Sequence, residues 1–410
     1  MAKVVMLGNF SLLNKGTMRA RALPLARALV KRGHDVSLVL SALDAPKVAG
    51  TLTTEDGVAV YHVPARKLPL VREGGVVADQ VHHVWTARPD VVHVFKPISF
   101  AGAAGAVVSA LRAARLHGCR LVVDSDDWEG TGGWVDLDRR PRWQRWIVDR
   151  QERWGLHHGD AVTVASRHLM TLSWALGVTP SKVFYVPNGI DNTMDLDREA
   201  AGQVRSALDL GDAPVILLYT RFFEFDLHSV VSLLRQTVFS LPHAKLLVVG
   251  RGFYGEENRL ETILAEEELA SSARFAGWVE PKNLPAYFAA ADVAVYPFAD
   301  TLVNRTKCPA KLVELLAAGV PVVAQAVGQI QEYVEHGVSG LLVSAGEDEA
   351  FAHAAVDLLG DAALRERLGA GALRRISERF LWERLVPRVE AAYGIESSDG
   401  VGVEGGRVYV

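Results

Sequence analysis

Short apolar runs alternate with helical patterns along most of the chain, and this alternation restricts the fold more than any other feature. In the first half the runs occur at Val4–Leu7, Val36–Leu40, Val91–Phe95, Leu121–Val123, Ala161–Ala165 and Val183–Val186. Continuous apolar runs of this kind predict strands that are buried on both faces. Between the first two runs, apolar residues recur with helical spacing from Ala22 to Leu29, and Gly33 follows as a helix stop. A helix between two such strands makes a right-handed crossover, so a parallel sheet is expected.

The same pattern starts again after a polar stretch at Asp191–Asp212. Its strands are predicted at Val215–Tyr219, Lys245–Val249, Val293–Tyr296, Val320–Ala324 and Gly340–Val343, with helices such as Val230–Phe239 and Lys311–Ala318 between them. A chain of 410 residues also exceeds what one core usually supports. The fold class is therefore α/β, with two tandem Rossmann-like parallel-sheet domains expected to face each other across a cleft.

The domain boundaries follow from the two sets of strands. We predict an acceptor-side domain at 1–188, a donor-nucleotide domain at 189–378, a C-terminal helix at 379–396 that crosses back to the first domain, and a loose tail at 397–410.

Composition excludes several classes of protein. The chain has 49% hydrophobic and 22% charged residues and a formal net charge of -4, as ordinary globular proteins do. A binder of nucleic acid normally needs a strongly basic face, so no such partner is expected. Cys119 and Cys308 are too far apart in sequence to predict a metal clamp or a disulfide framework, which fits a reducing compartment. No signal-peptide pattern and no apolar run long enough to span a membrane is seen, so we expect a cytoplasmic protein.

The loop after the first strand contains Gly8 and Gly16 and leads into a helix. Free backbone N–H groups at the positive end of a helix suit an anion, and a tight turn at Gly16 is an equally good interpretation. The loop lacks the Gly-x-Gly-x-x-Gly pattern, and the second strand ends in Ser41 instead of an acidic residue. These absences disfavour a nicotinamide oxidoreductase.

The second half carries more specific motifs. Asn304–Gly319 places Pro309 at a predicted helix start and Glu314 within that helix, before the next strand. The other motifs are Tyr185–Asp191, Thr220–Phe222, Gly277–Val279, Ala291–Pro297 and Val327–Gln329 followed by Glu332. In order and spacing, from the first strand to about Tyr393, they resemble the retaining glycosyltransferases of the GT-B fold called family 4, or glycosyl transferases group 1.

This resemblance implies a role for each matching residue. Glu314 would accept hydrogen bonds from the ribose hydroxyls of a nucleotide-sugar donor, and Arg221 would hold the donor diphosphate and act as a catalytic group. By the same resemblance, Trp278 and Val279 would contact the nucleobase of the donor. Gly328 and Gln329 would approach its sugar or phosphate, and Asn188 would lie near the floor of the cleft.

The chain also departs from the family pattern. The family's first glutamate falls on Thr306, which is kept as a donor-binding candidate, and its diphosphate lysine falls near Asp226–His228. Lys307 or Lys311 would replace that charge near the start of the helix, where phosphate is favoured. The alternative that Lys311 only decorates an exposed helix turn stays open.

A cluster of carboxylates, Asp124–Asp127, directly follows a predicted strand. Paired carboxylates can bind magnesium, but Arg221 would already supply the cation, so no metal and no other cofactor is expected. We assign Asp126 a catalytic role in orienting the acceptor hydroxyl, with Asp127 and Trp128 on the acceptor side. Loop capping is an equally weighted interpretation of these carboxylates.

The segment Arg139–Trp154 mixes arginines with tryptophans at helical spacing. We expect the tryptophans to pack on the sheet while the arginines face water. The alternative, peripheral contact with the inner face of the membrane, stays open.

The function implied is transfer of a sugar from a nucleoside-diphosphate sugar, a UDP- or GDP-sugar foremost, to a hydroxyl acceptor with retention of anomeric configuration. The acceptor would be a saccharide, a lipid-linked molecule or a small molecule. A sugar-nucleotide epimerase of the same fold and a non-catalytic sugar-nucleotide or partner-binding subunit remain alternatives. A requirement for an acceptor separates transfer from epimerisation, and tight donor binding without turnover would indicate the non-catalytic subunit.

Overall fold

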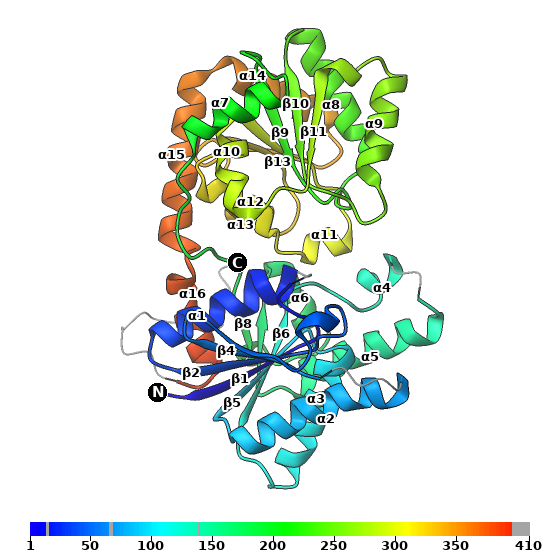
Figure 1. Cartoon of the computed structure of the whole chain (residues 1–410), viewed down its shortest axis with the longest axis vertical. Helices are drawn as coiled ribbons and strands as arrows, with labels where there is room; N and C mark the ends of the chain where they lie inside the picture. Colours follow the sequence, from blue (N-terminus) through cyan, green and yellow to red (C-terminus); the bar gives the residue numbers. More distant parts are fainter. Residues whose placement is uncertain (14–15, 65–68, 138–139, 396–410) are drawn as a thin grey trace. The chain divides into compact units, whose positions relative to one another are not determined.

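A computed structural model describes residues 1–13, 16–64, 69–137 and 140–395 (Figure 1). The chain divides into two compact units. The first unit contains residues 1–191, 306–308 and the chain from Trp382 onward, and the second contains residues 192–305 and 309–381. The domain boundaries expected from the sequence stay predictions, and the tail predicted at 397–410 lies outside the described residues.

The first unit is built on an eight-stranded sheet with the order β3-β4-β2-β1-β5-β6-β7-β8. The strands are β1 Lys3–Gly8, β2 Asp35–Leu40, β3 Leu52–Glu55, β4 Val58–His62, β5 Val91–Phe95, β6 Arg120–Ser125, β7 Ala161–Val164 and β8 Val183–Tyr185. All neighbours pair in parallel except β3 and β4. Parallel pairing of the central strands agrees with the crossover units read from the sequence.

The helices of the first unit follow the strands in the expected alternation. They are the π-helix Met18–Ala22, α1 Leu23–Lys31, α2 Pro69–Ala87, α3 Ser99–Ala113, α4 Trp134–Leu137, α5 Arg142–His158, α6 Arg167–Ala175 and α16 Trp382–Ala392, with short 3-10 turns at Pro46–Val48 and Pro180–Lys182.

The second unit has a six-stranded, fully parallel sheet with the order β11-β10-β9-β12-β13-β14. Its strands are β9 Val215–Tyr219, β10 Lys245–Val249, β11 Ala273–Gly277, β12 Val293–Tyr296, β13 Val322–Gln325 and β14 Leu341–Val343. Its helices are α7 Arg198–Ala207, α8 Leu227–Ser240, α9 Glu256–Glu266, α10 Leu284–Ala289, α11 Leu302–Thr306, α12 Ala310–Ala317, α13 Ile330–Tyr333, α14 Asp348–Gly360 and α15 Ala362–Arg379, with 3-10 turns at Ala270–Ser272 and Pro281–Asn283.

Three strands were not predicted, and all three lie at or next to a sheet edge. β3 is largely exposed and β4 alternates between buried and half-buried residues, so neither reads as a continuous apolar run. The pair forms a hairpin around Asp56 and Gly57, both with positive φ, which is the turn that an Asp-Gly pair favours. β11 is short and mostly half-buried, and Arg274 interrupts it.

The hydrophobic cores explain why most strands could be predicted from the sequence. In the first unit, apolar side chains cover both faces of the sheet, so the central strands are apolar at successive positions. The second unit has its own core around β9, β10 and β12 and helices α8 and α14. α16, the last helix among the described residues, contributes Trp382, Leu385 and Val389 to the first unit's core.

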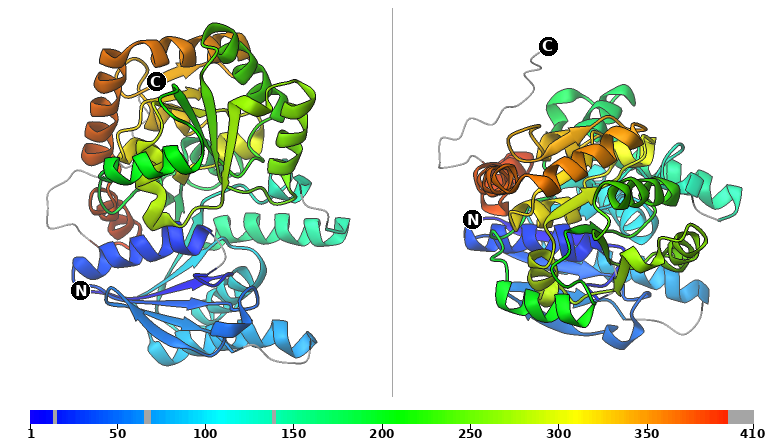
Figure 2. Two further views of the ribbon diagram at one scale, coloured as in Figure 1. Left: turned by 45° about the horizontal axis from the view of Figure 1, so that its top comes forward. Right: turned by 90° about the horizontal axis from the view of Figure 1, so that it is seen from above.

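The expected packing of the tryptophan helix is wrong for its first turns. Trp143 and Trp146 on α5 are 62% and 61% exposed, and Ile147 beside them is also exposed. Figures 1 and 2 show the start of α5 projecting outward from the sheet of the first unit. From Val148 onward the helix is anchored by buried residues, which also include Glu152 and Leu156.

Candidate active site

The turn after β9 directs Arg221 away from the strand. Phe222 has a positive φ, is buried in the core, and donates its backbone N–H to Thr220 Oγ1 at 2.8 Å. A bulky residue rarely adopts this conformation, so buried contacts must hold it. The neighbouring Gly250, with φ +133°, lies so close to the Thr220 carbonyl oxygen that no side chain would fit there. The turn is therefore fixed on both sides.

Arg221 is half-buried and lies against aromatic rings. Its guanidinium carbon is 5.3 Å from the ring centre of Phe223 and 5.8 Å from that of Phe253, which follows β10. The two rings also contact each other at 5.5 Å. Such contacts orient a guanidinium without neutralising its charge.

Tyr219, Lys311 and Glu314 form a compact cluster at the same end of the sheet. The Tyr219 hydroxyl donates to Glu314 Oε2 at 2.8 Å, and Lys311 Nζ lies 3.3 Å from the centre of the Tyr219 ring. Burial raises the pKa of the Glu314 carboxyl, while Lys311, the Tyr219 hydrogen bond and Arg221 oppose that rise. Arg221 and Glu314, 93 positions apart in sequence (314 − 221), thus lie close enough to interact electrostatically.

The turn before α13 is shaped by Gly328. Its φ is +53°, and a side chain at this position would collide with the backbone of Arg305. Gln329 beside it is buried. Trp278, directly after β11, is 64% exposed, and Val279 is half-buried.

Other predicted donor residues belong to the first unit. Asn188 Nδ2 donates to the carbonyl oxygen of Cys308, and Ser166 Oγ donates to the carbonyl oxygen of the fully buried Thr306. Lys307 is buried with its Nζ 6.0 Å from the centre of the Trp134 ring. Gly16 is exposed at the start of a helical turn.

The carboxylates after β6 surround a buried lysine that the sequence reasoning missed. Lys96 Nζ lies 3.3 Å from Asp126 Oδ1, 3.2 Å from Asp127 Oδ2 and 2.6 Å from Glu129 Oε1. Burial lowers the pKa of Lys96, but the three carboxylates outweigh it and the pKa ends well above its usual value. For Asp126, burial and the neighbouring acids outweigh the lysine and raise the pKa to about 6. The Asp126 carboxyl therefore keeps its proton to a higher pH than an ordinary aspartate does.

Asp124 and Trp128, which flank Asp126 and Asp127 in the sequence, have structural roles. Asp124 is fully buried and accepts two hydrogen bonds from Arg21, at 2.8 and 2.7 Å. Trp128 is buried, and its indole N–H donates to the Thr131 carbonyl oxygen at 2.9 Å. Among the described residues, no group of three or more histidine, cysteine or acidic side chains is arranged to hold a metal ion.

The signals for the missed residues differ. Lys96 directly follows β5 as Asp126 closely follows β6, so the shared edge of a parallel sheet could have suggested their proximity. Tyr219 is the last residue of an apolar strand and was read only as part of that strand. Nothing in its spacing shows a partner at Glu314.

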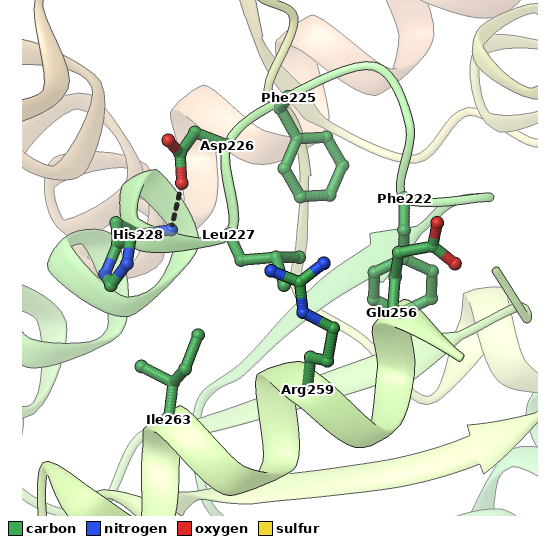
Figure 3. Close-up of a pocket in the computed structure, with 8 residues that line it drawn as sticks. All are labelled: Phe222, Phe225, Asp226, Leu227, His228, Glu256, Arg259 and Ile263. Atoms are coloured by element: carbon green, nitrogen blue, oxygen red, sulfur yellow. Dashed lines mark hydrogen bonds between the residues drawn. The ribbon is translucent and has the colours of Figure 1, made fainter. Parts of the chain in front are cut away.

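A cavity of about 260 Å³ lies beside the loop that follows Arg221 (Figure 3). The β9–α8 loop and α9 line it, with Arg259 rising from α9 towards Leu227. Asp226, where the family lysine falls, accepts from the backbone N–H of His228 and caps α8. A cap explains an acidic residue at this position, and none of the predicted donor residues lines the cavity.

Comparison with known families matches both halves of the chain. Residues 215–361 match the model described as glycosyl transferases group 1, and residues 16–189 match the model of the glycosyl transferase 4-like domain. No described helix combines the length and apolar character needed to cross a membrane.

Individual relatives extend the likeness over nearly the whole chain. The N-acetyl-alpha-D-glucosaminyl L-malate synthase of Bacillus anthracis is 25% identical, over 90% of this chain and 91% of its own. A GDP-mannose-dependent phosphatidylinositol monomannoside mannosyltransferase of Mycobacterium tuberculosis is 27% identical, over 72% of this chain and 75% of its own. The crystal structure of Anabaena HepE with UDP-glucose, 18% identical, superimposes with a TM-score of 0.71 over 96% of this chain and 100% of that one.

Because both units match models of one enzyme family and relatives align across both, the chain belongs to the group 1 glycosyltransferases, family 4, and is a GT-B enzyme that uses nucleotide sugars.

Proposed function

We propose that this glycosyltransferase takes its sugar from a UDP- or GDP-sugar and transfers it to a hydroxyl group with retention of anomeric configuration. The observation that carries the proposal is the convergence of Arg221, Lys311 and Glu314 at one end of the β9–β14 sheet. Two cations suit a diphosphate, and a carboxylate, which only accepts hydrogen bonds, suits the ribose diol. The relatives are consistent with either donor, since one is named for GDP-mannose and another was crystallised with UDP-glucose.

The remaining donor contacts are assigned by the family resemblance. Trp278 and Val279 would contact the nucleobase, and the exposed indole of Trp278 offers a stacking face. Gly328 lets backbone approach the sugar or phosphate, with Gln329 beside it. Gly16, Asn188, Thr306 and Lys307 are likewise proposed as donor-binding residues.

Retention would follow if the acceptor attacks on the face from which the diphosphate departs. The departing phosphate oxygen then takes the acceptor proton, while Arg221 and Lys311 stabilise the charge left on the diphosphate. The protein supplies position and charge and no covalent nucleophile. The NMR signal of the anomeric proton in the first-formed product reports the configuration directly.

The acceptor would be held at the carboxyl end of β6. Asp126, with its pKa raised to about 6, accepts a hydrogen bond from the acceptor hydroxyl when ionised, and Asp127 lies beside it. Trp128 supports this loop from inside. Saccharide, lipid-linked and small hydroxyl acceptors all fit this chemistry.

The donor site is tested by thermal shift with UDP-glucose, UDP-N-acetylglucosamine and GDP-mannose. A ligand at a hundred times its Kd adds about 2.7 kcal/mol of stability. We expect Arg221→Ala and Glu314→Ala each to abolish the largest shift. Arg235→Ala, an exposed arginine on α8 paired with Glu267, serves as the control and should keep it. A shift retained in both site variants would show that the donor binds elsewhere.

We also propose that the start of α5 contacts an anionic membrane surface. Trp143, Trp146 and Ile147 are exposed there, together with Arg142 and Arg150. Exposed aromatic and basic side chains on one helix suit the interface between lipid headgroups and acyl chains. This contact would place a lipid-linked acceptor near the enzyme.

A further inference from the structure

Tyr219, in the second unit, contacts both the acidic Glu314 and the basic Lys311 of the proposed donor site. The Tyr219 hydroxyl donates to Glu314 Oε2 at 2.8 Å, while its ring face lies 3.3 Å from Lys311 Nζ. Tyr219 itself is buried at the end of β9.

The ring of Tyr219 is held in place from another side. Phe288 of α10 packs edge to face against it, with ring centres 5.2 Å apart. A buried aromatic ring on a strand end, fixed by a second ring, has little freedom to rotate. Glu314 and Lys311, which contact Tyr219, are therefore oriented as well.

The hydroxyl of Tyr219 remains a donor at all physiological pH values. Burial and the neighbouring Glu314 carboxylate raise the pKa of Tyr219 far above its ordinary value. The proton consequently stays on the tyrosine, and Glu314 receives a hydrogen bond that favours its charged form.

We propose that Tyr219 is a positioning residue of the donor site, which orients Glu314 through its hydroxyl and Lys311 through its ring. This inference rests on the proposed function, in which Glu314 binds the ribose and Lys311 the diphosphate. One rigid side chain then sets the spacing between the group that recognises a diol and the group that recognises a phosphate. A ribonucleoside diphosphate is the class of ligand that fits this spacing, because it carries both a diol and a phosphate.

The two contacts can be separated by substitution. Tyr219→Phe keeps the ring under Lys311 and removes the hydrogen bond to Glu314. Tyr219→Leu removes both. Tyr287→Phe makes the same chemical change on a half-buried tyrosine of α10 and serves as the matched control.

The experiment measures binding of UDP, GDP and their 2′,3′-dideoxy forms by calorimetry. We expect Tyr219→Phe to weaken binding of the preferred ribonucleotide about tenfold, the size expected for one hydrogen bond to a charged group. Against the dideoxy nucleotide the same variant should bind like the wild type, because the diol that Glu314 would hold is gone. Tyr219→Leu should weaken binding of both forms, because Lys311 also loses its support.

The pH dependence of binding provides a second readout. Removing the Tyr219 hydrogen bond removes one interaction that lowers the pKa of Glu314. The loss of ribonucleotide binding on acidification should therefore begin at a higher pH in Tyr219→Phe than in the wild type or in Tyr287→Phe. A variant that was only less stable would not shift this profile.

The outcomes separate the two proposals. If Glu314→Ala weakens ribonucleotide binding while Tyr219→Phe binds both nucleotide forms like the wild type, the positioning role is wrong and the donor site stands. Equal weakening of both forms by Tyr219→Phe also contradicts the positioning of Glu314. If Glu314→Ala binds the ribonucleotide unchanged, the proposed donor site itself fails.

Discussion

His93 shows how burial determines the protonation state of a single residue. It lies within the first unit's sheet, with Nδ1 2.9 Å from the Tyr393 hydroxyl and Nε2 3.1 Å from Thr163 Oγ1. Thr163 donates its proton to Asp124 Oδ2, so its oxygen accepts from His93, and Nε2 carries the ring proton. Burial, aided by Arg21 and opposed by Asp124, lowers the pKa of His93 to about 4.

This shift gives stability a pH dependence of definite sign. The unfolded chain protonates His93 below its ordinary pKa of about 6.5, and the folded chain does so only near 4, so stability contributed by His93 is lost as pH falls between these values. At pH 4.5 the loss is about 2.5 kcal/mol relative to pH 7.

His93→Gln should remove that loss. The raised pKa values of Asp126 and Glu152 act in the opposite direction, favouring the folded state on acidification, but they are common to both proteins. In urea unfolding, the stability difference between wild type and His93→Gln should shrink by about 2.5 kcal/mol from pH 7 to pH 4.5. His228→Gln, an exposed histidine, is the control. A difference independent of pH would contradict the buried neutral state of His93.

At the scale of elements, the same helix can be anchored at one end and exposed at the other. In α5, Glu152 is buried and receives hydrogen bonds from Ser125 Oγ and from the backbone N–H of Glu129, which ties the helix to the loop after β6. Trp143 and Trp146 extend beyond this anchored part. Helical spacing identified an amphipathic helix, but it did not show that Trp143 and Trp146 stay exposed.

The exposed start of α5 leads us to predict that the protein binds anionic membranes. Vesicles of phosphatidylcholine with phosphatidylglycerol should bind the protein, and added salt should weaken the binding, because arginines contribute charge attraction. Trp143→Ser with Trp146→Ser should reduce binding about tenfold, the loss of two interfacial aromatic anchors. Both side chains are exposed, so folding should be unaffected.

Phe239→Ser is the matched control for this sedimentation experiment. Phe239 is 90% exposed on α8 of the second unit, so the substitution also removes an exposed aromatic ring. Equal binding by the double variant and the wild type would contradict the membrane surface, as would equal binding to neutral vesicles.

At the scale of the whole molecule, α16 completes the first unit. Leu385 and Val389 of α16 are buried in the core that also contains Val4 and Val36. Arg32 and His34 reach Glu390 at 2.7 and 3.0 Å, and Arg120 donates to the Ala392 carbonyl oxygen. The first unit therefore cannot complete its core until the end of the chain is available.

Leu385→Ala should destabilise the first unit by about 2 to 5 kcal/mol, the usual cost of emptying a buried leucine site. Hydrogen exchange should rise in β1, β2 and β5 and remain unchanged in β9 to β13, which belong to a separate core. The exposed neighbour Arg384→Ala should change exchange in neither unit. Uniform loss of protection across both sheets would show that the two cores unfold as one.

Much of the fold could be predicted because buried parallel strands are apolar at nearly every position. β5, β9, β10 and β12 have the bounds predicted from that pattern alone. β3 and β11 could not be found in this way, because an edge strand is exposed to water on one side and admits polar residues such as Thr53 and Arg274. β4, next to the edge, alternates between buried and half-buried residues and forms no continuous apolar run.

The candidate site divides similarly. The sequence alone determined the order of the strands and helices that it predicted and, through motif spacing, that Arg221 follows a strand and Glu314 lies in a helix before the next one. Only the tertiary structure decided which side chains meet: Tyr219 with Glu314, Lys311 with the Tyr219 ring, and Lys96 with three carboxylates. The physical reason is that local patterns encode secondary structure, whereas contacts between residues far apart in sequence depend on how strands and helices pack.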